Sequence, residues 1–146
     1  MAVLAQVFTG THTDAVARAE ALDAGRPAGV GPHVDLGVAP EDLEELGRIA
    51  ARVVRFGSGD LEPVEIDLEH DRLYELPRFW CEVMAELASL TAADEPEAVG
   101  DVARAWGETE EMADVGDLAP LVRDLAALAA EARQADVALY LWTAVP

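Results

Sequence analysis

The sequence contains no lysine and no asparagine, and arginine supplies all ten of its Lys or Arg cations. The chain has 29 Asp and Glu residues against these ten cations, so its 146 residues have a formal net charge of -19. Such a surface repels nucleic-acid backbones and anionic membranes, whereas it attracts cations and basic proteins. The scarcity of positive charge therefore argues against a nucleic-acid or membrane partner and favours a basic protein partner.

Cysteine and long apolar runs are scarce as well. Cys81 is the only cysteine, so the chain cannot form an intramolecular disulfide bond, which favours a reducing compartment. Its neighbours Trp80, Val83 and Met84 predict a buried, protonated thiol rather than a nucleophile. No apolar run approaches ~18 residues, and the first residues lack the basic start of a secretory signal. We therefore expect a soluble cytoplasmic protein.

The familiar catalytic motifs are missing too. Ser58 and Ser89 are the only serines, and neither lies in a nucleophile elbow. The segment Thr11-His12-Thr13 follows an apolar run and could hold an anion at a helix start, but it lacks the glycine spacing and the lysine of phosphate-binding loops. A tight turn with a side-chain cap explains it better. The sequence favours a non-catalytic protein without a cofactor. It leaves open an enzyme that uses His12 with Thr11 and Thr13, or His70 with nearby carboxylates.

Apolar residues make up 51% of the chain, enough to build a core in one domain spanning residues 1–146. Residues 2–9 form an apolar run that predicts a strand, and residues 15–24 follow as a helix. The Gly- and Pro-rich stretch 25–40 predicts a loop with a short extended piece at residues 33–36.

Regular patterns continue after this loop. Pro40 precedes an amphipathic helix whose apolar residues recur at helical spacing, namely Leu43, Leu46, Ile49 and Val53. Val64, Ile66 and Leu68 alternate with acidic residues and predict a strand with one wet face. Three helices are expected next, over residues 79–90, 94–112 and 117–135, with Trp80 and Trp106 in the core. The apolar segment 137–145, which includes Trp142, predicts a closing strand paired with the first. The fold class is therefore α+β, with about five helices packed on a small sheet that includes N- and C-terminal strands.

One acidic cluster near the end of the fourth expected helix is the candidate partner-binding site. It consists of Glu108, Glu110, Glu111 and Asp114. Carboxylates near the negative end of a helix dipole repel one another, and a cationic partner surface would relieve that repulsion. The leading hypothesis is a protein-interaction or inhibitor-type module that binds a basic surface; a solubilising face and a homodimer remain open alternatives.

The alternative function is a small-molecule or metal-binding protein. Asp67, His70 and Asp71 lie close together in the segment EIDLEHDR and could hold a hard cation, although no EF-hand or zinc-binding pattern is present. His33 and Asp35 form a second potential acid-base or ligand pair. A solvated strand face followed by a turn, and a surface histidine, are the ordinary explanations of these two groups.

The C-terminal half resembles known uncharacterised proteins. Its three segments, LYELPRFWCEVMAEL, AWGETEEM and LVRDLAALAAEARQADVALYLW, are similar to small acidic actinobacterial proteins, and their helix-helix-helix-strand order is similar to the YfbM-like family of unknown function. The resemblance covers residues 73–145 and is one of pattern and composition rather than of a diagnostic motif. It carries no catalytic residues over to this chain.

Overall fold

The computed structural model describes residues 5–25, 32–55, 57, 59–66, 72–93, 95–113 and 115–143. These residues form an α+β fold, as the sequence predicts, in which five helices pack on an antiparallel sheet of order β2-β1-β5-β4-β3. The strands are β1 (Ala5–Gly10), β2 (His33–Leu36), β3 (Val64–Glu65), β4 (Leu73–Glu75) and β5 (Ala138–Thr143). The helices are α1 (His12–Asp23), α2 (Pro40–Val54), α3 (Arg78–Ala93), α4 (Ala98–Gly107) and α5 (Ala119–Ala135).

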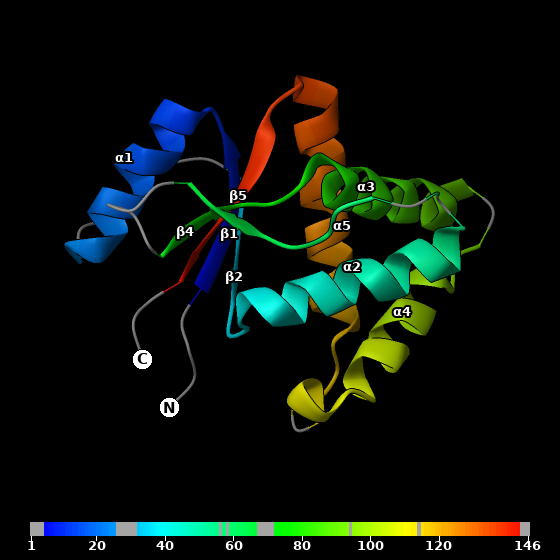
Figure 1. Ribbon diagram of the computed structural model, residues 1–146. Coiled ribbons are helices and arrows are strands. Elements are labelled where there is room, and N and C mark those ends of the chain that lie inside the picture. Colours follow the sequence, from blue (N-terminus) through cyan, green and yellow to red (C-terminus); the bar gives the residue numbers. More distant parts are fainter. Residues whose placement is uncertain are drawn as a thin grey trace.

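The helices divide unequally between the two faces of the sheet. Figure 1 shows α1 on one side of the sheet and the four other helices on the opposite side. Alternation along β1 explains both contacts, because Val7 packs in the core under α2–α5 while Phe8 packs in a smaller core under α1. The three tryptophans are all buried, as expected, with Trp80 and Trp106 in the larger core and Trp142 in the smaller one.

The predicted pairing of the first and last strands is confirmed and forms the centre of the sheet. β1 and β5 run antiparallel from the pair Ala5–Thr143 to the pair Gly10–Ala138. β2 pairs with the other side of β1, so it lies at one edge of the sheet, and the short β3 lies at the other. β1 and β5 are thus neighbours although they are far apart in the sequence. β2 also contacts helix α5.

Two predicted elements differ from the structure. The expected helix over residues 94–112 is wrong in its extent, because α4 ends at Gly107 and a separate 3-10 turn covers Glu110–Met112. Thr109 stops the helix: its hydroxyl donates to the carbonyl oxygen of Trp106 at 2.7 Å and so satisfies a terminal acceptor. Asp94, the expected cap, lies outside the described residues.

The expected strand over residues 64–69 is confirmed only for Val64 and Glu65, and residues 67–70 lie outside the described part of the chain. Val64 was expected to be buried but is 59% exposed. It lies on an edge strand that pairs with β4 over two residues, and among the described residues no strand pairs with its other side. β4 itself was not predicted, because three residues are too few for a periodic pattern.

Candidate functional site

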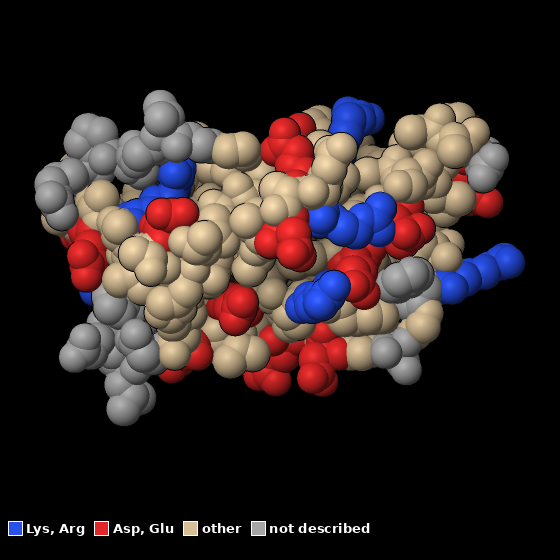
Figure 2. Space-filling model, turned by 90° about the horizontal axis from the view of Figure 1, so that it is seen from above, with Lys and Arg blue, Asp and Glu red and all other residues tan. Residues whose placement is uncertain are grey.

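Negative charge is spread widely over the molecule. Figure 2 shows acidic side chains scattered across the face that it presents, with several arginines directly beside them. Ion pairs occur both within and between helices, for example Arg104 with Asp101 at 3.0 Å and Arg133 with Glu86 at 2.7 Å. A binding site on this protein must therefore be located by unpaired charges and by surface shape, since acidity alone does not distinguish one region.

The predicted acidic cluster lies in the connection between α4 and α5. Glu108 caps the end of α4 and Glu110 begins the 3-10 turn, and both are exposed. Met112 is buried and anchors this turn in the core. The side chain of Glu111 and the whole of Asp114 lie outside the described residues. The structure thus places two of the four predicted carboxylates together at the surface and does not describe the other two side chains.

A groove between β2 and α5 combines negative charge with an apolar floor. We call it the acidic groove; its volume is about 570 Å³. Its apolar lining includes the half-buried Val34 and Leu121 and the buried Leu128. Asp117, Asp124 and Glu131 line it, and so does Asp35, whose own carboxylate is turned to Gln6 on the α1 side of the sheet. A surface that serves only to keep a protein soluble has no need of an apolar floor, so this groove is a better docking candidate than scattered charge.

Two of the groove acids share one face of α5. Asp124 and Glu131 are seven residues apart, which is close to two helical turns, and Asp117 lies two residues before the helix begins. Asp117 accepts a hydrogen bond from the backbone N–H of Ala119 at 3.1 Å and helps to start the helix. Asp124 and Glu131 are exposed and have no ion-pair partner among the described residues. They are therefore available to a basic ligand.

Strand β2 forms the other wall of the groove and has an open edge. One side of β2 pairs with β1 through the register His33–Phe8 to Leu36–Ala5. Among the described residues, no strand pairs with its other side. An unpaired strand edge presents backbone donors and acceptors to which an extended peptide can add. The acidic groove therefore offers backbone hydrogen bonds beside its carboxylates.

Asp35 is held in place by a polar network on the face of the sheet that α1 covers. Its carboxylate accepts a hydrogen bond from Gln6 Nε2 at 2.8 Å, and Gln6 Oε1 accepts one from Arg18 Nε at 2.6 Å. The Arg18 guanidinium also lies 5.0 Å from the centre of the Phe8 ring. Burial lowers the pKa of Arg18, while the charge of Asp35 raises it. The network ties the edge strand to β1 and α1 and so stiffens the groove wall.

The structure brings the predicted pair His33 and Asp35 together without a hydrogen bond. His33 Nε2 lies 3.8 Å from Asp35 Oδ2, and the Asp35 side chain is 73% exposed. Both residues line the acidic groove.

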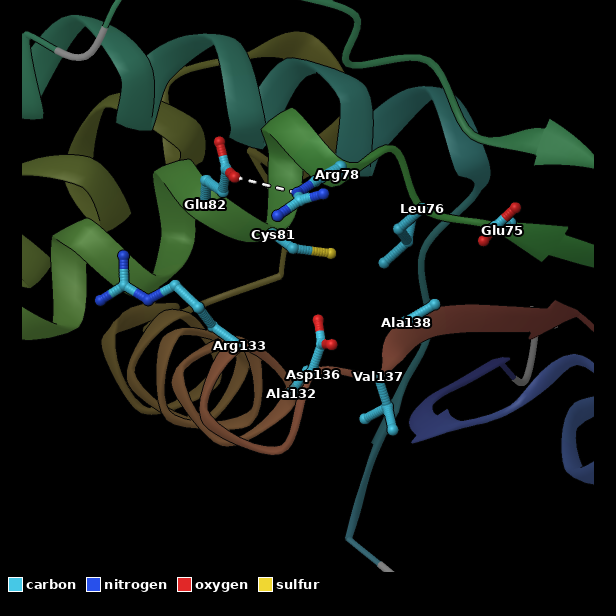
Figure 3. Close-up of a pocket in the computed structure, with 10 residues that line it drawn as sticks. All are labelled: Glu75, Leu76, Arg78, Cys81, Glu82, Ala132, Arg133, Asp136, Val137 and Ala138. Carbon is cyan, nitrogen blue, oxygen red and sulfur yellow. Dashed lines mark hydrogen bonds and ion pairs between the residues drawn. The ribbon is translucent and has the colours of Figure 1, made fainter.

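A second, smaller pocket lies between α3, α5 and the ends of β4 and β5 (Figure 3). The Cys81 thiol and the Asp136 carboxylate point into it, and Arg78 is bound to Glu82 at 3.2 Å. Burial raises the pKa of the Cys81 thiol to about 12, and the charge of Glu75 acts in the same direction. The prediction of a buried, protonated thiol is confirmed, so Cys81 is not a nucleophile at neutral pH.

The remaining predicted residues do not assemble into a site. Thr11 accepts a hydrogen bond from the backbone N–H of Asp14 at 3.2 Å, which confirms the expected helix cap, while His12 and Thr13 are exposed. Asp67, His70 and Asp71 lie outside the described residues, so the metal hypothesis stays a prediction. Within the described ranges, no three His, Cys, Asp or Glu side chains are placed to hold a metal ion. In the same ranges, no helix has both the length and the apolar character needed to span a bilayer.

Comparison with known proteins adds no relative: no protein-family model, curated protein or solved structure matches this chain. The similarity to the YfbM-like family stays a prediction.

The sequence analysis did not identify Asp124 and Glu131 as candidate site residues. The seven-residue spacing from Asp117 was a visible signal, but their meeting with β2 depends on a contact between residues about 90 positions apart, which no local pattern reveals.

Proposed function

We propose that this protein is a non-catalytic binding module that takes up a basic, extended segment of a partner protein in the acidic groove. The observation that carries this proposal is that, among the described residues, the outer edge of β2 has no strand partner and the nearby Asp124 and Glu131 on α5 have no ion-pair partner. Addition of a strand to β2 would supply backbone hydrogen bonds, and Asp124 and Glu131 would select basic side chains. Glu108 and Glu110 lie on the connection that leads into α5 and would strengthen the attraction over a longer range.

A basic partner suits this edge better than a second copy of the chain. A dimer formed through paired β2 strands would bring two acidic grooves together, and each copy carries a formal charge of -19. Like charges at an interface disfavour association. The free, buried thiol of Cys81 is compatible with a cytoplasmic setting, which is part of the proposal.

The test uses a short fluorescent peptide in which Arg and Val alternate, with binding measured by fluorescence anisotropy. The double variant Asp124→Asn/Glu131→Gln should weaken binding by about tenfold or more, equivalent to about 1.4 kcal/mol. The matched control is Glu95→Gln/Glu97→Gln, which removes the same charge from exposed positions before α4 and should change binding by less than about twofold. A third variant, Glu108→Gln/Glu110→Gln, should mainly slow association at low salt.

Backbone pairing is tested separately with the same peptide methylated on alternate backbone nitrogens. This peptide keeps its charge but cannot form the strand hydrogen bonds, so it should bind much more weakly. Equal loss of affinity in the groove and control variants, or equal binding of the methylated peptide, would show that the attraction is general and would overturn the proposal.

A further inference from the structure

Three of the ten arginines lie around one pocket at the end of helix α2. We call it the arginine pocket; its volume is about 440 Å³, and its walls include Arg48, Arg52, Arg55, Gly59, Leu61 and Phe79. None of the described residues that line it is acidic. Such a concentration of positive charge is unexpected on a chain with 29 acidic residues, since four of the described arginines elsewhere are ion-paired.

Helical spacing gathers these side chains on one face. Arg48, Arg52 and Arg55 are separated by four and three residues, so they lie along one face of α2 and its end. Arg48 is already bound to Glu44 at 3.1 Å and to Glu45. Arg52 and Arg55 have no carboxylate partner within the described part of the chain, although Arg72, Arg78, Arg104 and Arg133 each have one. Among the described residues, no carboxylate therefore occupies these two guanidinium groups, which are placed to bind an anion.

The helix dipole alone does not account for Arg55. Cations are favourable near the negative end of a helix, which explains why arginines occur there. Arg55, however, has the left-handed conformation with φ 57 and ψ 47, where glycine is favoured and a larger residue costs about 1 kcal/mol. Glycine would end α2 at lower cost, so the presence of arginine in this conformation points to a use for its side chain.

An apolar wall adjoins the guanidinium groups. The Phe79 ring packs so closely on Gly59 that a Cβ atom at Gly59 would lie 2.6 Å from Phe79 Cγ. Leu61 extends this wall. Arginine binds phosphate oxygens through parallel N–H groups, whereas an aromatic ring accommodates the organic part of a ligand. The pocket thus combines the two types of contact that a small phosphorylated molecule requires, at a size typical of ligand sites.

We propose that the arginine pocket binds a small phosphate monoester, with its phosphate on Arg52 and Arg55 and its organic part against Phe79. The high negative charge of the molecule favours a small ligand, because a polyanion such as a nucleic acid would extend beyond the pocket onto repelling surface. A phosphate monoester with a flat apolar group contacts only the local positive charge and the aromatic wall. This site is separate from the acidic groove and shares no lining residue with it.

The test measures binding of phenyl phosphate and of inorganic phosphate by calorimetry at constant ionic strength. Phenyl phosphate should bind more tightly than inorganic phosphate, because only the ester reaches the wall formed by Phe79 and Leu61. The variant Arg52→Gln/Arg55→Gln should lose about tenfold or more of this affinity. The control Arg123→Gln removes an exposed arginine of α5 outside the pocket and should bind phenyl phosphate within about twofold of the unmodified protein.

A further variant, Arg55→Gly, removes the side chain while relieving the left-handed backbone, so it should be at least as stable as the unmodified protein yet bind phenyl phosphate more weakly. Weakened binding in a stable protein excludes a loss of fold as the cause. Absence of binding at millimolar phenyl phosphate, or an equal loss in Arg123→Gln, would overturn the proposal. Neither result would bear on the acidic groove, whose test uses different residues and a ligand of opposite charge.

Discussion

At the scale of single residues, the close contact between α2 and α3 depends on Gly47. A Cβ atom at this position would lie 2.5 Å from Trp80 Cδ1, and the Trp80 indole N–H donates to the carbonyl oxygen of Leu43 at 2.8 Å. Gly47→Ala gains about 1 kcal/mol of helix propensity, but it introduces overpacking of about 1–3 kcal/mol and weakens a buried hydrogen bond of about 1 kcal/mol. We therefore expect the free energy of unfolding to fall by about 1–3 kcal/mol in urea denaturation.

Gly100 provides the matched control. It also lies inside a helix, α4, but nothing is within 4 Å of a Cβ atom added there. Gly100→Ala should therefore raise the free energy of unfolding by up to about 1 kcal/mol, since only helix propensity changes. If both alanine variants were stabilised equally, the described contact between Gly47 and Trp80 would be incorrect.

The raised pKa of Cys81 predicts how the free energy of unfolding changes at alkaline pH. Its pKa is raised to about 12 by burial, whereas a thiol in the unfolded chain titrates near ~8.5. The thiol of the unfolded chain therefore loses its proton at a lower pH than the thiol of the folded protein. Below about pH 8.5 the thiol is neutral in both states and its contribution to stability is fully present. That contribution is lost as pH rises from about 8.5 towards 12. Over that window the free energy of unfolding should fall by about 1.4 kcal/mol per pH unit from this group.

The control for this pH dependence is Cys81→Ala, which removes the thiol but keeps the other titrating groups. Tyr140 also has a pKa raised by burial and contributes a slope of the same sign in both proteins. The unmodified protein should therefore lose stability more steeply than Cys81→Ala between about pH 9 and pH 11. Parallel curves for the two proteins would contradict the described burial of the thiol.

At the scale of secondary-structure elements, a helix or strand could be predicted when its apolar residues repeated over a long enough stretch of sequence. Helix α2 was predictable because Leu43, Leu46 and Ile49 repeat at helical spacing and are all buried. Strands β3 and β4 have two and three residues, so their pairing is decided by tertiary contact rather than by a local pattern. The candidate sites could not be predicted from local patterns, because they depend on contacts between residues far apart in the sequence. Each carboxylate of the acidic groove is visible in the sequence, but the groove exists only because β2 is folded against α5.

The turn from α5 into β5 can be tested through its cap. Asp136 ends α5 in the left-handed conformation, with φ 57 and ψ 46, and its carboxylate lies near the negative end of the helix dipole. Asp136→Gly should therefore raise the free energy of unfolding by about 0.5–1 kcal/mol. Ala127→Gly, an exposed position inside the same helix, should instead lower it by about 1 kcal/mol. Destabilisation by both glycines would show that Asp136 contributes an interaction that outweighs its backbone cost.

At the scale of the whole molecule, the excess negative charge must be balanced by the energy of the packed core. Two of the ion pairs, Arg48–Glu44 and Arg78–Glu82, are exposed and within single helices, so each contributes only a few tenths of a kcal/mol. The long-range repulsion among the remaining carboxylates is not removed by such local pairs. Stability should therefore depend on ionic strength more than it does in a protein of balanced charge.

Added salt should raise the melting temperature of this protein. Screening shortens the range of repulsion to about 10 Å at 0.1 M ionic strength, so most of the rise should occur below about 0.2 M sodium chloride. Choline chloride should act equally at the same ionic strength, because screening does not depend on the cation. The variant Glu108→Gln/Glu110→Gln, which removes exposed carboxylates at the negative end of α4, should melt at a higher temperature than the unmodified protein in low salt, and the difference should shrink as salt increases. A rise with sodium but not with choline would instead identify specific cation binding, and no rise with either would mean that the -19 charge is too dispersed to oppose folding.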